Sequence, residues 1–186
     1  AYLQMKRYRE AALIMDRMID ELPPGEVTEQ AALNIIRCWS ALEDWPNSIS
    51  SAQKFARLFP QSKHLAEARF MEIDGLLSLL RNEEAAAAYL KFAEQFPASD
   101  RAPEARFMRA FSLLQAEKNM EAAEAFRDFL KRHPGHTRAD SAAYWLAMSY
   151  SFDKQYESCR GLMDEYLAKN PKGAHRGQAE IGRAHV

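Results

Sequence analysis

The sequence has no apolar run long enough to cross a bilayer. Its most apolar windows, such as AALIM, are short and interrupted by charged residues, whereas a spanning helix needs about 18 consecutive apolar residues. It also lacks an excess of charge, because 25 basic residues stand against 26 acidic ones. A near-neutral chain offers little attraction to phosphate backbones. We therefore expect neither direct membrane insertion nor a nucleic-acid partner.

Cysteine is scarce, and catalytic motifs are missing. Cys38 and Cys159 are too far apart in sequence to suggest a metal or redox motif. The sequence contains no GxGxxG, Walker-type GK[ST], HExxH or GxSxG motif. His133 and His136 flank a turn, but no third ligand lies near them in sequence. The sequence therefore predicts no catalytic, cofactor-binding or metal-binding residue, and a protein that is not an enzyme.

What the sequence does contain is a repeat. Residues 59–71 read FPQSKHLAEARFM and residues 96–108 read FPASDRAPEARFM, with eight of the thirteen positions identical. The same spacing of 37 residues separates five prolines: Pro23, Pro60, Pro97, Pro134 and Pro171. Three further sets of residues recur with the same period, and we call each set a column. Two columns hold small residues: Ala31, Ala68, Ala105, Ala142 and Ala179; and Ala11, Ser48, Ala85, Ala122 and Cys159. The third column holds large residues: Met18, Phe55, Phe92, Phe129 and Tyr166. A fixed period of this length indicates a repeat architecture.

Each repeat contains two helical patterns. In NMEAAEAFRDFLKRHP the apolar residues recur at helical spacing, and the closing proline ends the helix. Pro103 is expected in the first turn of its helix, and Asn82 and Asn119 are predicted helix caps. Such helix pairs bury their apolar faces only by stacking on their neighbours. The sequence thus predicts an all-α protein.

The small residue in the second helix of each repeat, the aromatic residue four positions later and the closing proline resemble the tetratricopeptide repeat. The stretches HPGHTRADSAAYWLAMSY and FPASDRAPEARFMRAF are similar to the tetratricopeptide domain of the bacterial Tol-Pal accessory family and, more loosely, to the outer-membrane assembly lipoprotein family. The resemblance implies a right-handed α-solenoid of antiparallel helix pairs. It also implies a protein or peptide partner and a periplasmic or outer-membrane-associated location.

We expect residues 1–180 to form a single solenoid, and we interpret it as a fragment of a longer array because neither end carries a polar capping helix. Apolar faces at Ala1 to Met5 and after Gly173 could then support self-association. The last six residues, IGRAHV, resemble a translated sequencing adapter, so 181–186 are interpreted as a non-native tail. The alternative is a natural tail, since Ile181 and Ala184 suit the helical register.

The tetratricopeptide resemblance also implies a binding groove lined by the first helix of each repeat. Transferring the family's groove positions gives ten candidate residues, which are Leu33, Arg37, Glu67, Phe70, Asp74, Glu104, Phe107, Phe111, Tyr144 and Met148. An aromatic stripe at helical spacing can equally be part of the core, so both interpretations of the apolar members stay open.

The function that the resemblance implies is a non-enzymatic scaffold of the bacterial cell envelope. Two alternatives remain at this stage. The chain could be the interaction arm of a larger enzyme or regulator, or it could be a cytosolic adaptor. A complete reading frame would distinguish the three hypotheses.

Overall fold

The structure is a computed structural model that describes the backbone of residues 2–185 and the side chains of residues 6–183. Across residues 2–185 it consists of ten α-helices without a strand, which confirms the all-α prediction. The helices are α1 (Tyr2–Glu21), α2 (Glu26–Ala41), α3 (Trp45–Leu58), α4 (Leu65–Ser78), α5 (Asn82–Gln95), α6 (Ala102–Gln115), α7 (Asn119–Arg132), α8 (Ala139–Phe152), α9 (Tyr156–Lys169) and α10 (Arg176–His185).

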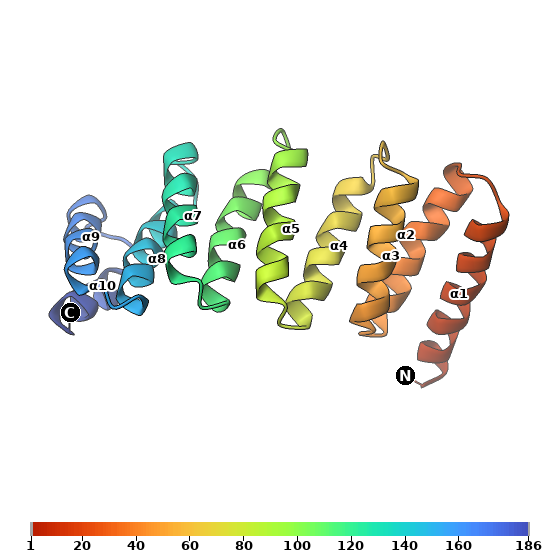
Figure 1. Ribbon diagram of the computed structural model, residues 1–186, viewed down its shortest axis with the longest axis horizontal. Coiled ribbons are helices and arrows are strands. Elements are labelled where there is room, and N and C mark those ends of the chain that lie inside the picture. Colours follow the sequence, from red (N-terminus) through yellow and green to blue (C-terminus); the bar gives the residue numbers. More distant parts are fainter. Residues whose placement is uncertain (1, 186) are drawn as a thin grey trace. The chain divides into compact units, whose positions relative to one another are not determined.

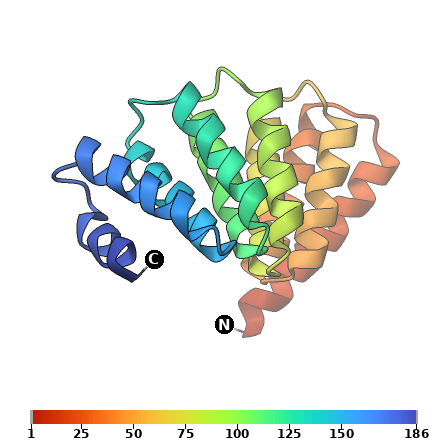
Figure 2. The same cartoon turned by 60° about the vertical axis from the view of Figure 1, so that its left-hand side comes forward.

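The helices form two compact units, Ala1–Arg81 and Asn82–Val186. In the first unit, α1 packs on α2, α2 on α3 and α3 on α4, and α2 also contacts α4. In the second unit, each helix from α5 to α10 packs on the next one in the chain. Figures 1 and 2 show the consecutive helices of each unit side by side. The single solenoid over residues 1–180 stays a prediction.

The five prolines follow the ends of helices, as the repeat predicts. Helices α1, α3, α5, α7 and α9 all end one or two residues before a proline of the 37-residue column. The residue before Pro60, Phe59, has φ −128° and ψ 60°, and His133 before Pro134 has φ −133° and ψ 54°. Proline disfavours helical angles at the preceding residue, which explains why each helix stops there.

The other turn of each repeat is closed by a residue in the left-handed conformation. Glu43, Leu80, Glu117 and Lys154 have φ between 55° and 60°, and they stand 37 residues apart. After each of them, the next backbone N–H donates to a carbonyl five residues earlier, as Arg81 does to Leu76 at 2.9 Å. This hydrogen bond is the Schellman closure of a helix C-terminus. None of these positions is glycine, so no residue type in the sequence predicts the turn.

The periodic small and large residues lie inside the helix packing. Ala68, Ala105, Ala142 and Ala179 have no exposed surface, and Phe55, Phe92, Phe129 and Tyr166 are at most 2% exposed. Only α1 departs from the pattern, because Ala11 and Met18 are half-buried while Ala12 and Ile19 are buried. The alanine columns let neighbouring helices approach closely, and the aromatic column fills the space between them.

Two sequence predictions about helix ends are wrong. Asn119 is the first residue of α7 rather than its cap, because Lys118 holds the N-cap position. Asn82 likewise lies inside α5, and its side chain donates to the Gln115 carbonyl at 3.5 Å. Pro103, in contrast, lies in the first turn of α6 as predicted. Helix α10 continues to His185, so residues 181–185 are helical, while the origin of that segment stays a prediction.

Candidate peptide-binding face

The ten predicted groove residues lie on α2, α4, α6 and α8, the first helices of their repeats. In the first unit, Leu33 of α2 is completely buried and contributes to helix packing. Phe70 of α4 is half-buried, while Arg37 and Asp74 are exposed. The accessible part of this face in the first unit is therefore mainly polar.

An ion pair links α2 to α4 on this face. The Arg37 guanidinium donates to Glu67 Oε1 at 2.7 Å, and it also donates to Asn34 at 3.2 Å. His64 Nδ1 lies 3.7 Å from the other carboxylate oxygen of Glu67. Both partners of the Arg37–Glu67 pair are more than 40% exposed, so the pair stabilises the fold little. Its charges remain available to a partner.

In the second unit, Phe107 of α6 is 4% exposed and belongs to the packed core. Its ring meets those of Phe126 and Phe129 edge to face, each at a centroid distance of 5.7 Å. The Arg138 guanidinium carbon lies 5.2 Å from the centre of the Phe107 ring on another side. The Phe107 side chain therefore packs α6 against α7 and offers little surface to a partner.

Tyr144 of α8 is also buried, at 8% exposure, and burial raises the pKa of its phenol. Its ring stacks on the imidazole of His175 at 4.5 Å and meets the ring of Tyr166 at 6.2 Å. Ser141 bonds the Nε2 atom of the same imidazole at 3.1 Å. These contacts tie α8 to α9 and to the segment that precedes α10.

Three half-buried side chains on α6 and α8 form an apolar surface that we call the aromatic patch: Phe111, Trp145 and Met148. The Phe111 and Trp145 rings meet at 5.5 Å with an interplanar angle of 78°. Trp145 and Met148 are one helical turn apart, so they face the same side of α8. Phe111 and Met148 were predicted groove residues, but Trp145 was missed because it is not at a groove position of the tetratricopeptide family.

A second ion pair of this face connects α6 to the start of α8. Arg138, just before α8, donates to both carboxylate oxygens of Glu104 at 3.0 and 3.3 Å. This two-pronged geometry suits a guanidinium and a carboxylate. Glu104 and Glu67 occupy the same repeat position, and each is bound by an arginine from a neighbouring repeat.

The histidine pair examined for metal binding serves the packing of a turn. The rings of His133 and His136 lie 5.5 and 5.6 Å from the ring of Phe129. Burial, with the nearby Arg106 charge, lowers the pKa of His133. Among the residues whose placement is described, no group of three or more His, Cys, Asp or Glu side chains is arranged to hold a metal ion.

Two further predictions concern membranes and association. Within the described residues, no helix combines the length and apolar character needed to cross a membrane. Of the faces predicted to self-associate, the side chains of Ala1 to Met5 lie outside the described residues. On α10, Ala179 is buried and Ile181 is 62% exposed.

Several solved structures have a fold similar to that of this chain. A putative kinesin light chain with nearly identical TPR-like repeats from Podosopora anserina has a TM-score of 0.61 and 11% sequence identity, over 90% of this chain and 89% of that one. BtubC (BKLC) from P. vanneervenii has a TM-score of 0.57 and 13% identity, over 98% and 81%. The apo form of RapI has a TM-score of 0.58 and 12% identity, over 92% and 69%. At these identities the likeness establishes a tetratricopeptide-like fold alone.

No curated protein sequence matches this chain. The family model described as YfiO, outer membrane lipoprotein, matches residues 1–87 and again residues 81–161. These two matches cover most of the chain, and the family is one of the two that the sequence resembles. With its repeat of paired helices, the chain belongs to the YfiO outer membrane lipoprotein family.

Proposed function

We propose that this protein is a scaffold of the bacterial cell envelope that binds a partner peptide or protein through the first helices of its repeats. The observation that carries the proposal is the aromatic patch on α6 and α8, where Phe111, Trp145 and Met148 are only half-buried. Large side chains that keep exposed surface on adjacent helices are the usual anchors of protein interfaces. The charged pair of Glu104 on α6 and Arg138 just before α8 provides a polar rim.

The buried members of the predicted groove support this surface from below. Phe107 and Tyr144 fix the spacing of α6, α7, α8 and α9, while the aromatic patch supplies the contact area. A fully buried aromatic side chain contributes about 1.5 to 3 kcal/mol. Two anchors of this size contribute about 3 to 6 kcal/mol, whereas micromolar affinity needs about 8 kcal/mol beyond the costs of ordering the partner, so the partner must make further contacts around the patch.

The location is proposed from the family. YfiO is a family of outer membrane lipoproteins, which favours the periplasmic side of the outer membrane for this chain as well. Fractionation of the tagged full-length protein in its own host tests this. Recovery in the outer-membrane fraction is expected, and recovery only in the cytosol would contradict the proposal.

Peptide selection tests the binding surface. Peptides selected from a random library on the wild-type chain should carry aromatic or aliphatic anchors. The double variant Phe111→Ala, Trp145→Ala should weaken their binding by about tenfold or more at a temperature where its helix content equals that of the wild type. Tyr156→Ala is the matched control, because Tyr156 is a 49% exposed aromatic residue on α9, outside the patch. Peptides that bind the double variant as well as the wild type would refute the proposed surface.

A further inference from the structure

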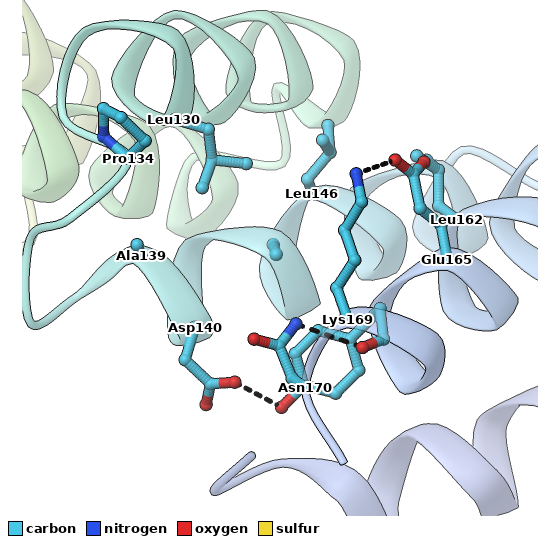
Figure 3. A pocket seen from close by; sticks show the side chains of 11 residues that line it. Leu130, Pro134, Ala139, Asp140, Leu146, Leu162, Glu165, Lys169 and Asn170 are labelled. Carbon is cyan, nitrogen blue, oxygen red and sulfur yellow. Dashed lines mark hydrogen bonds and ion pairs between the residues drawn. The ribbon is translucent and has the colours of Figure 1, made fainter. Parts of the chain in front are cut away.

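A pocket lies among α7, α8 and α9, inside the second unit and separate from the aromatic patch. It has a volume of about 320 Å³, at the lower end of the range of ligand sites. Figure 3 shows Leu130 from α7, Pro134 just after α7, Ala139 and Asp140 from α8, and Glu165 and Lys169 from α9 around it. Its walls are mostly apolar, and carboxylates and one lysine stand among them.

The repeat explains why this pocket exists. Ala143 is one of the α8 side chains that line it, whereas the residues 37 and 74 positions earlier are Arg106 and Arg69. In the preceding repeat, Arg106 is half-buried and lies 3.6 Å from Asp128 of α7. Burial, and after it the charge of Arg106, lowers the pKa of His133 just after α7. Arg106 therefore occupies the place that is open beside Ala143.

The acidic partner of the missing arginine is still present. Glu165 corresponds to Asp128, and Asn170 corresponds to His133, each one period later. Asp128 is paired with two arginines, Arg132 at 2.7 Å and Arg106 at 3.6 Å.

Glu165 keeps a partner equivalent to Arg132, because Lys169 lies 2.5 Å from it. It has no partner equivalent to Arg106, because Ala143 stands at that position. The repeat thus leaves a space beside a carboxylate, where the preceding repeat holds a guanidinium.

The other walls suit the stem of an arginine side chain. Leu130, Leu146 and Leu162 replace Ala93, Arg109 and Ala125 of the preceding repeat, so this pocket is more apolar. Arginine packs its methylene groups along apolar surface and keeps its guanidinium at a polar edge.

The second carboxylate of the pocket is already engaged. Asp140 accepts from the Tyr166 hydroxyl at 2.9 Å and from the Ala174 N–H at 3.0 Å. Figure 3 shows the Asp140 bond on the side of the pocket opposite the Lys169–Glu165 pair. Asp140 therefore fixes the wall, and Glu165 is the carboxylate with room for a further cation.

We propose that this pocket binds an arginine side chain presented by a partner polypeptide, with Glu165 pairing to the guanidinium as Asp128 pairs to Arg106. The site is distinct from the aromatic patch and does not depend on it. It would give the scaffold a second, charge-selective contact, formed by α7, α8 and α9.

A peptide titration followed by two-dimensional NMR tests this proposal. The probe is acetyl-Gly-Arg-Gly-amide, with the Gln peptide as its neutral control, at concentrations up to about 10 mM because a single anchor gives millimolar affinity. Saturable shifts of the backbone amides in 162–170 are expected with the Arg peptide. Glu165→Gln should weaken binding about tenfold, since glutamine keeps one acceptor oxygen but loses the negative charge that strengthens the hydrogen bonds to a guanidinium. Glu124→Gln, an exposed acid on α7, is the matched control and should bind normally.

Two variants test the repeat argument directly. Ala143→Arg should fill the pocket and abolish the shifts. Arg106→Ala should open an equivalent space beside Asp128 and add a second set of saturable shifts in 125–133, a readout that does not depend on whether Ala143→Arg folds.

Several results would overturn the proposal: equal affinity for the Gln peptide, unchanged affinity in Glu165→Gln, or no shift at about 10 mM peptide. Shifts in 162–170 that depend on protein concentration without peptide would identify a second copy of the chain as the occupant instead.

Discussion

Replacing Phe107 by alanine separates a packing role from a binding role. The ring is 4% exposed, so the variant loses nearly the whole transfer free energy of a phenyl group, about 1.5 to 3 kcal/mol. It also loses the edge contacts with Phe126 and Phe129, and it leaves a cavity between α6 and α7. Substitutions of this kind cost about 3 to 5 kcal/mol, and we expect Phe107→Ala to lower the free energy of unfolding by that amount.

Urea unfolding monitored by circular dichroism measures this loss. Phe111→Ala is the matched control, because Phe111 lies one turn later on α6 and is half-buried. Its cavity opens to solvent, so a loss of only about 1 to 2 kcal/mol is expected. Similar m-values in both variants would show that the same transition is compared. A loss below about 1 kcal/mol for Phe107→Ala, or one no larger than that of Phe111→Ala, would refute the packing role.

Two further predictions concern single side chains, one in each unit. Gly75→Ala should destabilise the first unit by up to about 2 kcal/mol, although alanine favours helices, because the added Cβ would lie 2.8 Å from Ile49 Cγ1. In an Ile49→Ala background, which removes the clash, Gly75→Ala should instead raise the melting temperature. Thermal melts in which Gly75→Ala lowers the melting temperature in both backgrounds would contradict this. Burial, together with the hydrogen bond to Asp140, raises the pKa of Tyr166 from 10.0 to about 12. The folded state therefore holds this proton more tightly than the unfolded state, so the contribution is present below pH 10 and is lost as the pH rises toward 12. Between about pH 9 and pH 11, the urea midpoint of unfolding should fall further for the wild type than for Tyr166→Phe. Equal falls in the two proteins would refute the raised pKa of Tyr166.

The sequence predicted the parts of the fold that depend on side-chain size. The alanine and aromatic columns are buried because close helix packing needs a small residue at one place and a large one at another. The prolines mark helix ends because their effect on the preceding residue is local.

The closing turns at Glu43, Leu80, Glu117 and Lys154 could not be predicted. Their left-handed backbone is imposed by the hydrogen bonds of the helix end, and no residue type marks it.

The candidate site was harder to predict, because the groove positions of the tetratricopeptide family tell which side of a helix a residue lies on but not how much of its side chain is exposed. Leu33 and Phe107 share the predicted groove position, yet both are buried against neighbouring helices. Phe111 and Met148 keep exposed surface because they lie one turn further along their helices. Trp145 could have been found by searching for large apolar residues on either side of each groove position.

Departures from a repeat are more informative about binding than the repeat itself. A position that keeps its residue type, such as Ala68, Ala105 and Ala142, is explained by packing that every repeat needs. The column of Ala32, Arg69, Arg106, Ala143 and Glu180 holds arginine only at 69 and 106, and the structure has a pocket beside Ala143, directly after the second arginine. Because the acidic partner is retained as Glu165, loss of the arginine is not balanced by loss of the charge it would pair with. Glu165 is more than half exposed and already paired with Lys169, so its charge costs the fold little without the arginine, and room for a second cation remains beside it.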